Sequence, residues 1–399
     1  MSALYGTYAR SDLAFERGEG VRVFTADGTP YLDFGSGIGV NALGYGDPHV
    51  VGALKAAADR VWHTSNIFTI PEQEKLGQRL VDATFAESVF FTNSGAEAVE
   101  CAIKTARHYF FAKGEPERYE IIAFTGSFHG RTLGTIAAGG NPHYTEGFGP
   151  VLPGFRHLAP GDLTAVEALI DDRTCAILLE PVQGEGGVTA MPVEFLKGLR
   201  ELCDRYGLLL ILDEVQCGYG RTGKFFAYEW AGIEPDIMAV AKGIGGGFPL
   251  GACLAKGDVA KSMVPGTHGS TYGGNPLACA VGNAVLDRIL GPGFIGNVEL
   301  MGQRLAWHLQ QLQQRYPNYV TEVRGKGLMA GVRITPPVRD FVNRLRRDHK
   351  LLTVAAGENV LRLLPPLIVT EDDIIEAMDK IAAAFDALDK EAASTPAID

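Results

Sequence analysis

Two charged residues that each follow an apolar run are the first candidates for chemistry in this chain. Asp213 comes directly after Leu208–Leu212, and Lys242 follows Ile237–Ala241 and precedes the glycine-rich stretch GIGGGFPLG. Ligands of open parallel sheets bind at the carboxyl ends of strands, so charged side chains there are well placed to act on a ligand. Asp213 could equally be a helix N-cap. Lys242 has no obvious solvated surroundings, and the glycines beside it let a bulky ligand approach the backbone.

A third candidate is the segment NSGAE at residues 93–97, which lies between an apolar run and a helical pattern. Small residues at the start of a helix leave backbone N–H groups free, and this suits a phosphate group. Ser94 and Glu97 also have the spacing of an ordinary capping box. A phosphate site and a plain helix start therefore both remain open for this segment.

These candidates need a scaffold, and the middle of the chain has the pattern of an α/β sheet. Several short runs are nearly all apolar, which is typical of parallel strands covered on both faces. They are Val89–Thr92, Ile121–Phe124, Cys175–Leu179, Leu208–Leu212 and Ile237–Ala241. Helical stretches such as Glu97–Phe111 and Val193–Tyr206 lie between them, as crossover helices do. The sequence therefore predicts an α/β fold with a mostly parallel sheet.

The pattern changes after about residue 295, where we expect a smaller α+β domain. The predicted elements are a helix Val298–Tyr316, a strand Val323–Val332, a helix near Val338–Asp348, a strand around Leu361 and a helix Glu371–Leu388. The tail EAASTPAID is expected to be disordered. The predicted domains are a segment 1–50 that packs with the small domain, a large domain 51–294 and the small domain 295–399.

Composition narrows the class of protein. A length of 399 residues is typical of two or three domains, and a net charge of −11 argues against nucleic-acid binding. The six cysteines are far apart and have no metal-ligand spacing, as expected of buried thiols in a reducing compartment. No segment resembles a targeting peptide or a membrane span. We therefore expect a cytosolic protein without a metal site.

Together, these pieces resemble the class III (ω-amino acid) aminotransferases, which have fold type I and use pyridoxal 5'-phosphate (PLP). The resemblance rests on LLLILDEVQCGYGRTGKFFAYE, PDIMAVAKGIGGGFPLGA and HGSTYGGNPLACA, and on the 29 residues that separate Asp213 from Lys242. It extends from YLDFGSGIGVN to LRLLPPLIV, which is nearly the whole chain. It implies the PLP-dependent transferase fold type I, with a large and a smaller domain.

The resemblance also implies roles for the cofactor-binding residues. Lys242 would carry the cofactor and move the proton at the substrate carbon, and Asp213 would keep the pyridine nitrogen protonated. Gln216 would bind the phenolic oxygen O3', and Phe128 would stack on the ring. The phosphate would be bound by Ser94, Gly95 and Ala96 of one subunit and Thr271 of a second. This implies a homodimer with shared active sites.

Three charged residues are implied in substrate binding. In relatives that act on ornithine-like substrates, the arginine that matches Arg131 binds a carboxylate, and the one that matches Arg362 binds the α-carboxylate of 2-oxoglutarate. A guanidinium suits a carboxylate because it donates two parallel hydrogen bonds, although either arginine could instead form a surface ion pair. Glu185 resembles the gate residue, which neutralises Arg362 when the amine donor binds and moves away for 2-oxoglutarate.

Ile38 narrows the amine donor. It lies where ornithine δ-aminotransferases carry a tyrosine that faces the α-amine of the substrate, and an isoleucine there would tolerate an acylated nitrogen. Ile38 could also simply be a core residue. The resemblance is greatest to the branch that transfers the δ-amine of N2-acetylornithine to 2-oxoglutarate. The products of this ping-pong reaction in arginine biosynthesis are N-acetylglutamate 5-semialdehyde and glutamate. N2-succinylornithine, succinyl-diaminopimelate and free ornithine remain alternative donors.

The same residues distinguish a two-substrate aminotransferase from other classes of protein. A PLP-dependent aminomutase shares the motif GGGFP but works within one substrate, so the set of Arg131, Arg362 and Glu185 favours a two-substrate enzyme. A decarboxylase on the same scaffold remains possible. The complete set of cofactor residues argues against a non-catalytic PLP-binding protein. NSGAEAVE lacks the pattern GxGxxG, which argues against a dinucleotide-dependent oxidoreductase.

Overall fold

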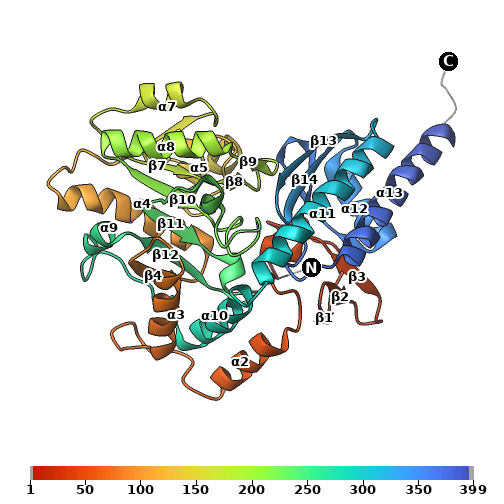
Figure 1. Ribbon diagram of the computed structural model, residues 1–399, viewed down its shortest axis with the longest axis horizontal. Helices are drawn as coiled ribbons and strands as arrows, with labels where there is room; N and C mark the ends of the chain where they lie inside the picture. The colour runs from red at the N-terminus through yellow and green to blue at the C-terminus, as the bar shows by residue number, and fades with distance from the viewer. Residues whose placement is uncertain (1–2, 395–399) are drawn as a thin grey trace.

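A seven-stranded sheet forms the centre of the larger part of the protein, seen here in a computed structural model that describes residues 3–394 (Figure 1). The strand order is β4-β12-β11-β10-β7-β5-β6. The strands are β4 (Ser88–Thr92), β5 (Glu120–Phe124), β6 (Phe155–Leu158), β7 (Thr174–Leu179), β10 (Leu209–Asp213), β11 (Ile237–Val240) and β12 (Gly251–Ala255). Only β12 runs antiparallel to its neighbours, β11 and β4. The prediction of an α/β fold with a mostly parallel sheet is therefore confirmed.

The sheet is buried on both faces because alternate side chains of its strands enter different cores. In β10, Leu209 and Ile211 pack in one cluster with residues of α4 (Gly95–Ala112). Leu210 and Leu212 pack in another cluster with residues of α8 (Val193–Tyr206). This is why the central strands are almost entirely apolar rather than alternating.

The predicted central strands agree with the observed ones to within one or two residues, but β6 and β12 were not predicted. The single strand predicted over Val323–Val332 is wrong. The chain forms a hairpin there, made of β13 (Val320–Lys326) and β14 (Met329–Ile334). Gly327 makes the turn with a φ of 59°, and a Cβ at this position would lie 2.4 Å from the backbone of Thr222. β13 is mostly polar, so the sequence pattern does not mark it as a strand separate from β14.

In the C-terminal part, helices pack on a four-stranded sheet of order β13-β14-β17-β16 (Figure 1). Its further elements are α11 (Phe294–Arg315), α12 (Val338–His349), α13 (Glu371–Ser394), β16 (Val354–Ala356) and β17 (Val360–Leu363). The expectation of a disordered tail from residue 391 is wrong for residues 391–394, which continue α13. Glu391 is held by an ion pair with Arg344 at 2.7 Å. Residues 395–399 lie outside the described part.

The N-terminal strands pair with a strand from the C-terminal part. β1 (Arg17–Glu19), β2 (Arg22–Phe24) and β3 (Pro30–Asp33) form a sheet with β15 (Leu351–Leu352). The predicted domain boundaries at residues 50 and 294 stay predictions.

The remaining α-helices are α1 (Ser36–Gly39), α2 (Pro48–Ala58), α3 (Pro71–Asp82), α5 (Leu133–Gly139), α6 (Pro142–Thr145), α7 (Leu163–Leu169), α9 (Gly257–Lys261) and α10 (Pro276–Ile289). The remaining short strands are β8 (Val182–Gln183) and β9 (Thr189–Ala190). None of the helices within residues 3–394 has the length and apolar character that a membrane crossing needs.

Candidate active site

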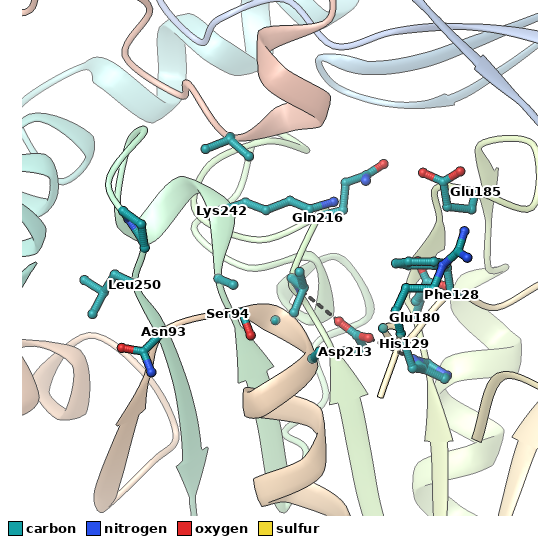
Figure 2. A pocket seen from close by; sticks show the side chains of 18 of the residues that line it. Asn93, Ser94, Phe128, His129, Glu180, Glu185, Asp213, Gln216, Lys242 and Leu250 are labelled. Carbon is teal, nitrogen blue, oxygen red and sulfur yellow. Dashed lines mark hydrogen bonds and ion pairs between the residues drawn. The ribbon is translucent and has the colours of Figure 1, made fainter. Parts of the chain in front are cut away.

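A cavity of about 460 Å³ lies at the carboxyl ends of the central strands (Figure 2). It brings together nine of the residues predicted from the sequence. These are Ser94, Gly95, Ala96, Phe128, Arg131, Glu185, Asp213, Gln216 and Lys242. Asp213 is the last residue of β10, and Lys242 follows β11 by two residues, so two neighbouring parallel strands deliver the two residues expected to act on the cofactor.

The side chain of Lys242 extends into this cavity (Figure 2). Its amine has no hydrogen bond or ion pair with any residue in the described part of the chain. Burial lowers the pKa of Lys242 to about 8, and the nearby charge of Arg362 acts in the same direction. The lowered pKa increases the neutral fraction of the amine, which is the nucleophilic form. The backbone of Lys242 has a φ of 52°, a strained conformation of the kind that functional sites hold in place.

Asp213 is held rigidly by two donors. It is 2% exposed, its Oδ1 accepts a hydrogen bond from the backbone N–H of Val215 at 3.0 Å, and its Oδ2 lies 2.8 Å from Nδ1 of His129. Burial alone would lower the pKa of His129, but the hydrogen bond and charge of Asp213 raise it above its ordinary value. His129 was not predicted from the sequence. Its only sequence signal is its place beside Phe128 in the motif SFHGRT, because 84 residues separate it from Asp213.

Glu180 is a second buried residue that was not predicted from the sequence. It directly follows β7 and lines the cavity. Its carboxylate accepts hydrogen bonds from the backbone N–H groups of Phe128 at 2.8 Å and Gly184 at 3.2 Å. Burial raises the pKa of Glu180, and the charge of Asp213 adds to this effect. The carboxylate therefore fixes the backbone of the segment that carries Phe128 and His129.

The N-terminus of α4 lies at another side of the cavity. Ser94 Oγ accepts a hydrogen bond from the backbone N–H of Glu97, and Glu97 Oε2 accepts one from Asn93 rather than from Ser94. Only half of the expected capping box is thus formed. As the first residues of the helix, Gly95 and Ala96 have N–H groups without a helical acceptor, which suits a phosphate. A Cβ on Gly95 would lie 2.7 Å from Val215 Cγ1, so only glycine fits there.

These features fit PLP. The unpartnered amine of Lys242 suits reaction with the aldehyde carbon of PLP, and the buried carboxylate of Asp213 suits an ion pair with its protonated ring nitrogen. The open N–H groups at the start of α4 match a phosphate. Phe128 contributes an aromatic face to the same cavity. The individual contacts to the cofactor are proposals.

Arg362 lies behind the cavity lining rather than in it. This residue of β17 is 1% exposed, although its Nη2 lies 2.7 Å from Oε1 of Glu185 and its Nη1 donates to Oε1 of Gln216 at 3.0 Å. The structure therefore contains the ion pair that the gate requires. Because Gln216 Oε1 accepts from Arg362, the amide N–H₂ of Gln216 remains available as a donor.

Arg131 is exposed at the cavity and makes no ion pair or hydrogen bond with the described residues. The alternative that it forms a surface ion pair is therefore wrong. Its guanidinium instead lies over the ring of Tyr144, with Cζ 3.9 Å from the ring centroid, and 5.6 Å from the centroid of Phe128. All its N–H donors are left free for an anionic ligand.

Thr271 and Ile38 do not line the cavity. Thr271 is exposed, and the neighbouring Ser270 and Gly273 line a different cavity. Ile38 is 43% exposed, so the alternative that it is a core residue is wrong. It belongs to the left-handed turn of α1, in which every residue has a positive φ, and Val40 lines the cavity in its place. The contact between Ile38 and a substrate stays a proposal.

Comparisons with known proteins identify the family: the chain belongs to the class-III aminotransferases, whose family model matches residues 7–385. Acetylornithine aminotransferase of Brucella melitensis is 57% identical over 385 residues, which covers 96% of this chain and 95% of that protein. The Rhodobacter capsulatus enzyme of the same name is 53% identical and covers 98% of this chain and 100% of its own length.

Solved structures agree with this assignment. The crystal structure of N-acetylornithine aminotransferase from Stenotrophomonas maltophilia has a TM-score of 0.84 and 36% identity, with 96% of this chain and 98% of that chain covered. The ornithine aminotransferase from Toxoplasma gondii has a TM-score of 0.93 and 31% identity, with 98% and 94% covered. The predicted fold type, enzyme class and cofactor are thereby confirmed.

Proposed function

We propose that this enzyme transfers the δ-amine of N2-acetylornithine to 2-oxoglutarate, in two half-reactions at one site. The observation that carries the proposal is the arrangement of two arginines around the cavity of Lys242. Arg131 has free donors, whereas Arg362 is neutralised by Glu185 at 2.7 Å. Arg131 is thus always available to a carboxylate, and Arg362 becomes available only when Glu185 moves away. This suits two substrates, because 2-oxoglutarate has two carboxylates and N2-acetylornithine has one.

When bound, PLP supplies an aldehyde that combines with amines and a ring that accepts the electron pair of the substrate carbon. Lys242 holds the cofactor and then moves the proton at the reacting carbon, a role that its lowered pKa suits. Asp213 keeps the ring nitrogen protonated, and His129 holds Asp213 in place at 2.8 Å. Gln216 donates its free amide N–H to the phenolic oxygen. Ser94, Gly95 and Ala96 bind the phosphate.

The two substrates differ at the end beside Arg362. The α-carboxylate of N2-acetylornithine binds Arg131, and the Glu185–Arg362 pair stays closed because the reacting end has no carboxylate. 2-Oxoglutarate places its γ-carboxylate on Arg131, and its α-carboxylate displaces Glu185 from Arg362. Glu185 is able to leave because 30% of its side chain is exposed, so its charge can be hydrated.

Relatives that are 53–57% identical to this chain are named acetylornithine aminotransferase, which supports the assignment of an acetylated donor. A relative from Photorhabdus laumondii, 47% identical, is named acetylornithine/succinyldiaminopimelate aminotransferase, so a succinylated donor is the second candidate. The test is a donor panel with 2-oxoglutarate that includes acetylated, succinylated and free ornithine. We expect N2-acetylornithine to give the highest kcat/KM. An aminomutase would instead convert glutamate 1-semialdehyde without any 2-oxoglutarate.

We further propose that the enzyme is a cytosolic homodimer in which Thr271 of each subunit binds the phosphate in the other. The exposed position of Thr271 outside its own cavity supports this. Mixing inactive Lys242→Ala subunits with impaired Thr271→Asp subunits should restore activity, because one site of each mixed dimer has both native residues. Statistical mixing of a two-fold dimer restores about one quarter of the sites. No recovery on mixing would contradict the shared site.

A further inference from the structure

The guanidinium of Arg131 is held by aromatic rings rather than by an acid. Its Cζ lies over the ring of Tyr144, 3.9 Å from the ring centroid, which is close for a cation–π contact. Within the described residues, Arg131 has no polar partner, and the hydroxyl of Tyr144 has none either. The contact between these two residues is therefore made by the ring face alone.

This kind of contact suits a residue that must bind a carboxylate. An acidic partner would fix the arginine but would also neutralise it and occupy its donors. A ring face restricts the motion of the guanidinium and leaves its N–H groups free for the substrate. A free arginine side chain also loses more conformational entropy on binding than one that is already held.

Tyr144 is itself fixed from two sides. Its ring packs edge-on against Phe128, with centroids 5.9 Å apart and planes at 88°. Tyr144 belongs to the short helix α6, which Asn141 caps by accepting a hydrogen bond from the backbone N–H of His143 at 3.0 Å, with Pro142 as its first residue. Phe128 is in turn fixed by Glu180 through its backbone N–H. The ring of Tyr144 thus connects the residue expected on the cofactor with the residue expected on the substrate carboxylate.

We propose that Tyr144 is a positioning residue, whose ring face holds Arg131 in the orientation that binds the distal carboxylate of both substrates. This rests on the proposed function, because that function assigns the carboxylate to Arg131. Tyr144 touches neither reacting atoms nor cofactor in this role. The aromatic ring is the essential part, and the hydroxyl is dispensable.

The test compares Tyr144→Leu with Tyr144→Phe in the holoenzyme. Tyr144→Leu should raise KM for N2-acetylornithine and 2-oxoglutarate by about two- to fivefold, with a smaller effect on kcat, since the cation–π contact of an exposed arginine is lost. Tyr144→Phe keeps the ring and should behave like the wild type. The binding of glutarate, a dicarboxylate that cannot react, should weaken by the same factor in Tyr144→Leu when measured by calorimetry.

A donor without a carboxylate separates positioning from a merely structural role. N-acetylputrescine has the chain of N2-acetylornithine but lacks the carboxylate, so Tyr144→Leu should leave its kcat/KM unchanged. Adding Tyr144→Leu to an Arg131→Leu enzyme should likewise cause no further loss. Equal losses for both donors, additive losses in the double variant, or a defect in Tyr144→Phe would each overturn the proposal. If instead wild-type enzyme fails to react with N2-acetylornithine, the donor assignment is wrong, and the glutarate measurement still tests Tyr144.

Discussion

Replacing Arg362 with leucine should separate the two half-reactions. In the 2-oxoglutarate half, the substrate carboxylate loses a partner that is 1% exposed. Removing one partner of a buried ion pair costs about 3–5 kcal/mol, and the lower value applies here because Glu185 on the other side is partly hydrated. We therefore expect kcat/KM for 2-oxoglutarate to fall by about a hundredfold.

The amine-donor half should lose far less. The donor has no carboxylate beside Arg362, and the variant leaves Glu185 and the side-chain oxygen of Gln216 without this partner. Because 30% of the Glu185 side chain is exposed, water can replace part of the lost contact. The cost should stay near that of an exposed ion pair, about 1 kcal/mol, or roughly a fivefold loss.

Stopped-flow absorbance measures the two halves separately, because the cofactor absorbs differently before and after it receives the amine. Arg362→Lys keeps the charge without the fork and should give an intermediate loss for 2-oxoglutarate. Arg344→Leu is the matched control. Arg344 also pairs with a glutamate, Glu391, but it belongs to α12 rather than to the site. It should leave both halves unchanged. Equal losses in the two halves for Arg362→Leu would refute the gate.

Three further predictions concern other residues of the site. Borohydride should trap the cofactor on Lys242. The rate of cofactor capture by apoenzyme should rise about tenfold per pH unit up to about pH 8 and level off above it, because burial lowers the pKa of this amine to about 8. Asp213→Ala should lower kcat on the order of a thousandfold in steady-state assays, because a major electrostatic stabiliser is lost. Wild-type enzyme should prefer N2-acetylornithine over ornithine by about ten- to a hundredfold in kcat/KM, since an unpaired ammonium costs about 1–3 kcal/mol, and Ile38→Tyr should reduce this ratio.

Each of these predictions has a result that contradicts it. A cofactor adduct on any other lysine, or capture that continues to rise up to pH 10, would remove Lys242 from its role. Near-normal turnover in Asp213→Ala would mean that another group keeps the ring nitrogen protonated. An unchanged donor ratio in Ile38→Tyr would show that Ile38 does not reach the substrate, in which case Val40, which lines the cavity, is the next residue to change.

The central sheet was predictable because its strands are buried on both faces and therefore have uninterrupted apolar runs. β12 was missed because it directly follows the glycine-rich stretch after Lys242 and begins with a glycine of its own. The hairpin at Gly327 was missed because β13 is mostly polar and contains a glycine of its own, so that it has no strand pattern separate from that of β14. Local patterns thus identify the elements but not the points at which the chain reverses.

The residues of the site were predictable where the family resemblance gives them a role toward the cofactor or the substrate. The partners that hold them in place were not, because their positions depend on the packing of distant segments. Tyr144, His129 and Glu180 act through contacts with Arg131, Asp213 and Phe128, and no spacing in the sequence marks these contacts. The left-handed turn at Ile38 was equally hidden, since a β-branched residue at positive φ runs against the preference of its own backbone.

The pairing of β3 with β15 has a consequence for the biogenesis of this protein. Leu32 and Leu351 are neighbours in the sheet although more than 300 residues separate them in the chain. On the ribosome, β3 is therefore synthesised among the first elements, and its partner β15 is made only when almost the whole chain is complete. Until then, Leu32 and Phe34, which are at most 1% exposed in the finished fold, lack this cover. A chain released before β15 would expose these apolar residues and be a substrate for chaperones and proteases.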